Sequence, residues 1–129
     1  MNVIYEAFFV IDDLDSCLEK DIENKHITTE FRPSKSHEEL YGCEAKFIVT
    51  GYGNDEVNEG YSVKLISCES DELIELYNNI AIPHITLSVS KEGKPVNTSK
   101  LTFDPAEDDF TISTKFGGFI GGTPILHKI

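Results

Sequence analysis

The stretch AKFIVTGYGNDEVNEGYSVKLIS, residues 45–67, indicates the fold class most clearly. Its first part, residues 45–50, is rich in β-branched and aromatic residues and predicts a strand. Residues 51–60 are dense in glycine, asparagine and acidic residues, which is typical of a hairpin loop. Residues 61–67 then alternate in polarity with a period of two, as a half-buried strand does. Strands joined by a short loop run antiparallel, so the stretch predicts an antiparallel hairpin.

Further strands and two helices are expected around this hairpin. Apolar patterns predict strands at residues 3–11 (VIYEAFFVI), 26–31 (HITTEF), 84–89 (HITLSV) and 110–114 (FTIST). A first helix is predicted within residues 12–24, where helical spacing relates Leu14, Cys17, Leu18 and Ile22. A second is predicted after an N-cap at Ser70, with a buried face that holds Leu73, Leu76, Tyr77 and Ile80.

Hairpin-linked strands with two helices indicate an α+β fold rather than a doubly wound parallel sheet. The chain has 129 residues, within the range of a single domain, and no linker divides it. We therefore expect one domain over residues 1–129. Acidic runs such as residues 12–15 and 107–109 favour helix caps and solvated turns.

The charge balance limits the partners that are expected. The chain carries 11 Lys and Arg against 23 Asp and Glu, which gives a formal net charge of −12. Nucleic-acid affinity depends largely on Lys and Arg that neutralise phosphates. A surface this acidic should repel long duplexes and anionic membranes, whereas a small nucleotide or short oligonucleotide remains a suitable partner.

The sequence also indicates a compartment. Cys17, Cys43 and Cys68 are odd in number and far apart, which favours free thiols in a reducing cytoplasm over a structural zinc site. No apolar run approaches the ~20 residues of a membrane helix, and residues 1–6 lack the basic segment of a secretory signal. We therefore expect a cytoplasmic protein that neither spans nor binds membranes.

One tripeptide occurs twice. His26-Ile27-Thr28 and His84-Ile85-Thr86 each follow a predicted helix and open a predicted strand, as expected of a duplicated half-domain. In a strand, residues i and i+2 point to the same face. Each histidine should therefore project together with its threonine, while each isoleucine faces the core. If the two strands flank one cleft, two imidazoles and two hydroxyls converge.

That set of groups suits phosphodiester chemistry. A neutral imidazole accepts the proton of the attacking hydroxyl or water, and an imidazolium donates one to the departing oxygen. Histidine serves both roles because its reference pKa of ~6.5 lies near neutral pH. Threonine hydroxyls donate hydrogen bonds to the non-bridging oxygens, where charge accumulates. The steps require no metal or other cofactor, and the residues alone leave open which histidine is the base.

The paired motifs, here HITT and HITL, resemble those of the 2H phosphoesterase superfamily, which includes LigT-like and other cyclic phosphodiesterases. The resemblance would cover nearly the whole chain as a compact version. It implies a bilobal α+β fold, in which two related antiparallel sheets, with a helix in each half, flank a central cleft and each lobe carries one motif.

The resemblance also implies an activity. A member would be a metal-independent hydrolase that opens 2′,3′-cyclic phosphates or cleaves 2′–5′ or cyclic oligonucleotide linkages. His26 and His84 would be its acid–base pair, and Thr28 and Thr86 would hold the phosphate. Together with small size and acidity, the resemblance suggests one role, which is degradation of a cyclic-nucleotide signal, as in phage proteins that defeat bacterial immunity.

Other interpretations remain. Arg32, the only arginine, shares the strand parity of His26 and is expected either to grip the phosphate or to form a surface ion pair. The cleft alternatively binds and sequesters a nucleotide without cleaving it. Both histidines are alternatively strand-start residues bonded to backbone, or zinc ligands together with His37, a residue expected to be solvated. The glycines of KFGGFIGG, residues 115–122, are expected either to lay backbone N–H groups against a phosphate or to permit a tight turn or close strand contact.

Overall fold

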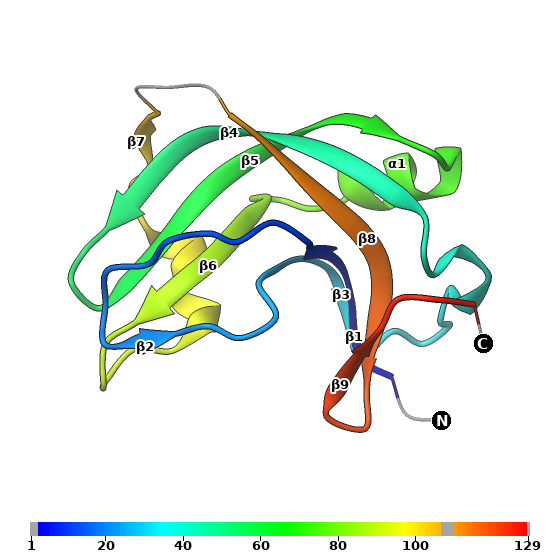
Figure 1. The fold of residues 1–129 in the computed structure, drawn as a ribbon, viewed down its shortest axis with the longest axis horizontal. Coiled ribbons are helices and arrows are strands. Elements are labelled where there is room, and N and C mark those ends of the chain that lie inside the picture. Colours follow the sequence, from blue (N-terminus) through cyan, green and yellow to red (C-terminus); the bar gives the residue numbers. More distant parts are fainter. Residues whose placement is uncertain (1–2, 107–109, 129) are drawn as a thin grey trace.

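The computed structural model describes residues 3–106 and 110–128 (Figure 1). Its strands are β1 (Val3–Val10), β2 (Lys20–Asp21), β3 (His26–Phe31), β4 (Glu44–Asn54), β5 (Asn58–Cys68), β6 (His84–Val89), β7 (Asp104–Pro105), β8 (Thr111–Ile120) and β9 (Thr123–Ile125). Its helices are α1 (Asp71–Asn78) and two short 3₁₀ helices, η1 (Glu38–Leu40) and η2 (Pro95–Lys100). The protein is thus mostly antiparallel β-sheet with few helices, in line with the expected α+β class. The acidic run 107–109 lies outside the described residues.

The predicted hairpin is present but is longer than its sequence pattern indicated. β4 and β5 pair from Ala45 and Cys68 to Asn54 and Glu59, which leaves only residues 55–57 as the turn. The expectation of a loop over residues 51–60 is therefore wrong. The glycines lie inside the strands because other segments pack closely on them. A Cβ on Gly60, for example, would lie 2.5 Å from the Thr98 Cγ2 and 2.6 Å from the Ile85 carbonyl oxygen.

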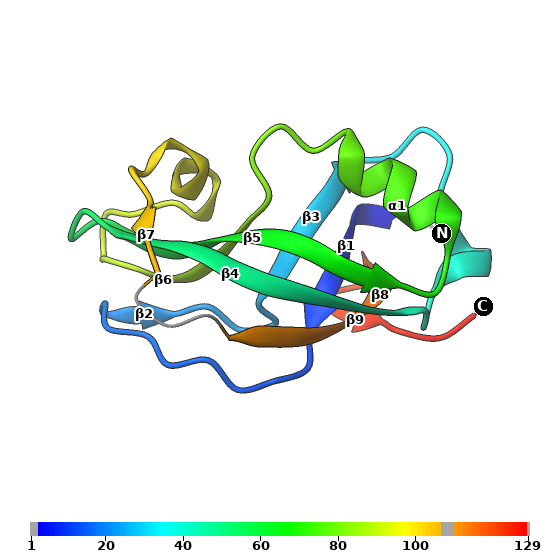
Figure 2. The ribbon, with the colours of Figure 1, turned by 90° about the horizontal axis from the view of Figure 1, so that it is seen from above.

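The nine strands of residues 3–106 and 110–128 belong to one curved sheet. Its main path has the order β2-β6-β5-β4-β8-β1-β3, while β7 pairs with β4 and β9 pairs with β8. Figure 2 shows the long β4–β5 hairpin running across the molecule, with α1 at one end and η2 at the other. Although β3 ends this path and β6 lies next to its other end, the two strands come into contact. The curvature thus brings the two repeated tripeptides to the same region.

The first expected helix is absent. Residues 12–19 form no regular structure, and β2 then pairs with β6. Tertiary partners take the place of helical hydrogen bonds here. The backbone N–H of Cys17 donates to the Glu59 carboxylate at 2.8 Å, and that of Leu18 donates to the Ser88 hydroxyl at 3.1 Å. With one continuous sheet and α1 as the only α-helix among the described residues, two related sheets with a helix in each half are not confirmed.

The core lies against the inner face of the sheet. Ile27 and Ile85, the middle residues of the two tripeptides, are fully buried in it, as strand alternation predicts. α1 begins after Ser70 and buries Leu73 in the same cluster, which confirms the second expected helix. No helix in the described part of the chain is long and apolar enough to cross a membrane.

Candidate active site

A pocket of about 640 Å³ lies where β3 approaches β6. His26 and Thr28 of β3 line it together with His84 and Thr86 of β6. The rest of the lining comes from β1, the segment after β2, the end of β3 and η2, and consists of Tyr5, Ile22, Glu23, Phe31, Pro95, Val96 and Ser99. The structure therefore brings both histidines and both threonines of the repeated tripeptides to one pocket.

The two imidazoles are held in the same way. The Nδ1 of His26 lies 2.8 Å from the backbone carbonyl oxygen of Asn24, and the Nδ1 of His84 lies 2.7 Å from that of Ile82. A carbonyl oxygen only accepts, so Nδ1 carries the hydrogen in both rings. In the neutral form, Nε2 of each ring then holds the lone pair. Both histidines bond to backbone, as one alternative expected, and both also line the pocket.

His26 lies in an apolar and aromatic surrounding. Its ring stacks on Tyr5 with a centroid distance of 4.6 Å, and Phe9 lies at 5.6 Å. Burial lowers the pKa of the His26 imidazole below its usual value, and the positive charge of His84 lowers it further, while the hydrogen bond to the Asn24 carbonyl works in the opposite direction. The neutral imidazole of His26 is therefore favoured near neutral pH.

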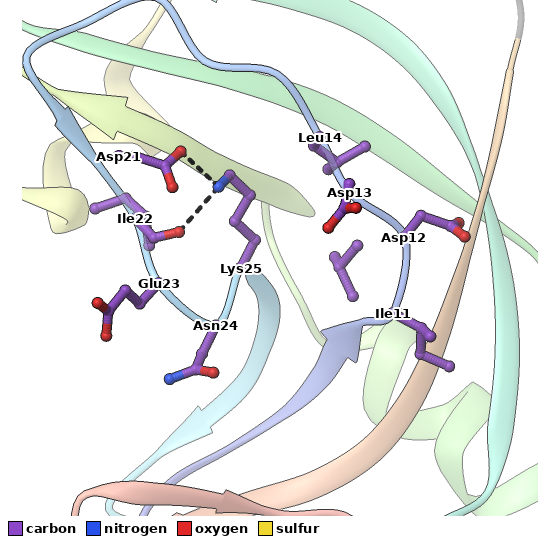
Figure 3. Close-up of a pocket in the computed structure, with 10 residues that line it drawn as sticks. Ile11, Asp12, Asp13, Leu14, Asp21, Ile22, Glu23, Asn24 and Lys25 are labelled. Atoms are coloured by element: carbon purple, nitrogen blue, oxygen red, sulfur yellow. Dashed lines mark hydrogen bonds and ion pairs between the residues drawn. The ribbon is translucent and has the colours of Figure 1, made fainter.

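A short turn positions His26. Asn24 adopts a left-handed conformation with φ of 55°, which directs its carbonyl toward the ring of the residue two positions later. Lys25 closes this turn, because its ammonium donates to the Asp21 carboxylate at 2.7 Å and to the Ile22 carbonyl at 2.9 Å. Figure 3 shows both contacts beside a second hollow of about 450 Å³, which shares Ile22 and Glu23 with the pocket.

The two threonines differ in their surroundings. Thr28 is half-buried in the pocket wall. Thr86 is nearly buried, and its hydroxyl lies 2.8 Å from the Thr98 Oγ1 and 3.3 Å from the Pro95 carbonyl oxygen. Thr98 also accepts a hydrogen bond of 3.0 Å from the Asn58 side-chain amide. These contacts fasten η2, which forms one wall of the pocket, to β5 and β6.

Arg32 does not line the pocket. β3 ends at Phe31, and Arg32 turns away from the strand in a left-handed conformation with φ of 49°. The strand parity that related it to His26 in the sequence therefore does not apply. Its guanidinium lies 5.5 Å from the centroid of the exposed Phe31 ring, which does line the pocket.

The zinc alternative finds no geometric support among the described residues, which contain no cluster of three His, Cys, Asp or Glu side chains suited to a metal. His37 lies elsewhere and is half-buried rather than solvated. Its Nδ1 and backbone N–H contact the two carboxylate oxygens of the buried Glu6 at 2.8 and 2.7 Å, and the Tyr41 hydroxyl donates to the same carboxylate at 2.7 Å.

The glycine-rich stretch 115–122 has a structural role. Most of it belongs to β8. A Cβ on Gly118 would collide with the Tyr41 ring, and one on Gly117 would collide with the Ile125 backbone. Gly121 and Gly122 adopt positive φ in the turn to β9. The structure therefore favours close packing over the alternative of a phosphate-binding loop.

Sequence reasoning did not identify several residues of the site. Glu23 belongs to neither copy of the repeated tripeptide, and the η2 residues reach the pocket only through tertiary packing. Glu59 was also missed. Its buried carboxylate accepts hydrogen bonds from the Tyr52 hydroxyl, the Ser88 hydroxyl and the Cys17 N–H, and so ties residues 12–19 to the sheet. In the sequence, Glu59 falls within the stretch predicted as a hairpin loop, so no pattern there indicates a buried carboxylate.

Neither a protein-family model nor a curated protein matches this chain. What the pocket does is therefore inferred from its own residues and their geometry.

Proposed function

We propose that this protein is a metal-independent phosphodiesterase that acts on a cyclic or 2′–5′ phosphodiester of a small nucleotide. The observation that carries the proposal is the pair of imidazoles in one pocket, each with Nδ1 bound to a backbone carbonyl. Nε2 is then the atom of each ring that exchanges a proton with substrate. One ring acts as general base and the other as general acid.

The lowered pKa of His26 supports its assignment as the base. Its Nε2 takes the proton of the attacking oxygen, a ribose hydroxyl or water, as that oxygen bonds to phosphorus. The protonated His84 gives its Nε2 proton to the departing oxygen as the bond from phosphorus to that oxygen breaks. Exchange with solvent restores both rings. Proton transfers of this kind typically contribute ~10²–10⁴-fold to the rate.

The threonine hydroxyls support the phosphate in this scheme. Thr28 donates to a non-bridging oxygen, where negative charge accumulates in the transition state. Thr86 does the same once its hydroxyl hydrogen rotates toward the pocket, since a hydroxyl rotates to suit its partners. Thr98, at 2.8 Å, then donates its own hydrogen to the Thr86 oxygen and leaves the Asn58 contact unchanged.

The lining supports a small nucleotide as substrate. The volume of about 640 Å³ lies within the usual range of small-molecule sites. Tyr5, Phe31 and Val96 provide apolar and aromatic surface against which a nucleobase can pack. With a net charge of −12 on the chain, cyclic or short oligonucleotides suit this site better than long duplexes. Degradation of a cyclic-nucleotide signal is a role that this activity would serve.

We also propose that the two halves of the chain are related by duplication. Three features support this: the repeated tripeptide, the burial of its isoleucine in each copy, and the bond from each histidine Nδ1 to the carbonyl two residues earlier. In this bilobal arrangement, each lobe is a unit of strands that carries one tripeptide, and the two units meet at the pocket.

The proposal is tested with the purified chain in the presence of EDTA. Substrates are 2′,3′-cyclic nucleotides and a panel of cyclic di- and trinucleotides. We expect turnover of at least one substrate, a loss of about 10²-fold or more in both His26→Ala and His84→Ala, and little change in His127→Ala, whose exposed ring is outside the pocket. Full activity in either pocket variant would exclude the paired roles.

Binding without cleavage is the second candidate. The apolar lining favours it, because Tyr5, Ile22, Phe31, Pro95 and Val96 make a binding surface that does not depend on chemistry. Calorimetry that shows tight binding, followed by recovery of intact ligand after long incubation, would support sequestration over hydrolysis.

A further inference from the structure

The pocket has an unusual charge composition for a site that binds phosphate. Among the described residues of its lining, Glu23 is the only charged one apart from the two histidines, and none is Lys or Arg. Arg32, the single arginine of the chain, lies outside the lining. With one imidazole protonated, the pocket carries one positive charge and one carboxylate.

The position of Glu23 is defined by its neighbours. The N–H of Ile22 donates to the Leu87 carbonyl at 3.0 Å, which ties this segment to β6. The nearest lysine along the chain, Lys25, is engaged with Asp21 and the Ile22 carbonyl. Figure 3 shows the Glu23 carboxylate pointing away from Lys25. Glu23 is exposed and belongs to the pocket lining, and its carboxylate is not paired with that ammonium, which contacts Asp21.

This arrangement distinguishes two kinds of phosphate. A phosphodiester carries one negative charge, whereas a phosphomonoester carries about 1.5–2 near neutral pH. One imidazolium balances the diester. The additional charge of a monoester meets the Glu23 carboxylate, and no Lys or Arg of the lining offsets that repulsion. For like charges within one Debye length at an intermediate effective dielectric, one such repulsion changes affinity about threefold to tenfold.

We infer that Glu23 is a specificity-determining residue that makes the pocket select internal phosphodiesters over ligands with a terminal phosphomonoester. The substrate class that fits is a nucleotide phosphodiester, cyclic or linear, that carries no terminal phosphate. The inference rests on the proposed function, because it concerns the same pocket. It also accounts for product release, since hydrolysis of a cyclic phosphate yields a monoester that Glu23 repels.

The test measures binding of two probes that differ by one group. Thymidylyl-thymidine dinucleotide, which lacks a 2′-hydroxyl, and its 5′-phosphorylated form are titrated into the protein by calorimetry. We expect the wild-type chain to prefer the unphosphorylated probe. In Glu23→Gln the ratio of the two affinities should fall about threefold to tenfold. Glu56→Gln is the matched control, because Glu56 is exposed in the β4–β5 turn and does not line the pocket.

A second measurement needs no variant. Repulsion between exposed charges is screened by salt, so the wild-type preference should shrink between low and high NaCl. An affinity ratio that is the same in Glu23→Gln and wild type would overturn the inference. If the affinity ratio is unchanged but Glu23→Gln still turns over a cyclic nucleotide in a way that depends on His26 and His84, the proposed function stands. If the wild type neither binds the probes nor cleaves any substrate, both fail.

Discussion

Thr98 connects the pocket wall to the sheet, and its removal allows a quantitative test. The side chain is fully buried, and its hydroxyl oxygen lies 2.8 Å from the Thr86 Oγ1 and 3.0 Å from the Asn58 Nδ2. Thr98→Val keeps the shape of the side chain and removes both hydrogen bonds. Asn58 retains its bond to the Lys94 carbonyl at 2.7 Å, and Thr86 retains only the 3.3 Å contact to Pro95.

The expected loss follows from these contacts. Each buried hydrogen bond contributes about 0.5–1.5 kcal/mol net, so two of them set a destabilisation of about 2 kcal/mol. For a chain of this size the melting temperature should fall by about 5–10 °C. Turnover of the cyclic-nucleotide substrate should also fall, by about tenfold, because Thr86 loses the donor that would support its contact with phosphate.

Thr98→Ser is the matched control. It keeps the hydroxyl and removes the methyl group that packs on Gly60, which should cost about 1 kcal/mol through lost burial. Stability is measured by urea and thermal denaturation, and activity by steady-state kinetics on the same samples. If Thr98→Val were as stable and as active as Thr98→Ser, the hydroxyl network would not hold η2, and the role assigned to Thr86 would be refuted.

Three further predictions follow from the same structure. Activity is lost when the base is protonated, so the lowered pKa of His26 places the acidic limb of the pH–rate profile below pH ~6.5. Any residual activity of His26→Ala should lack this limb. In Gly60→Ala the new Cβ would lie 2.6 Å from the Ile85 carbonyl oxygen, so β6 must shift, and denaturation should show a loss of about 1–3 kcal/mol together with reduced turnover. Burial raises the pKa of Glu59, but hydrogen bonds from Tyr52, Ser88 and Cys17 lower it more, so the folded-state pKa lies below the unfolded one. The ionised carboxylate therefore stabilises the fold fully above the unfolded pKa of ~4.3. This contribution to the free energy of unfolding disappears as pH falls through the folded-state pKa, so Glu59→Gln should flatten that part of a stability–pH curve.

Local patterns predicted the regular elements well where neighbouring residues decide the outcome. β6 spans the predicted residues 84–89, and α1 follows Ser70 with Leu73 buried, because alternation and helical spacing both reflect which face meets the core. The same spacing failed for residues 12–24. The N–H of Cys17 donates to Glu59, 42 residues further along the chain, and the N–H of Leu18 donates to Ser88, 70 residues further along.

The candidate site divides in the same way. From the sequence alone, each histidine was expected to share a strand face with its threonine, and this needs only the two-residue period of a strand. Arg32 lost that relation because the chain leaves the strand at a left-handed residue, which the pattern does not reveal. Only the curvature of the sheet brings β3 to β6, and only packing of η2 and residues 22–23 completes the pocket. Contacts between segments this far apart depend on the whole chain at once, so no local stretch encodes them.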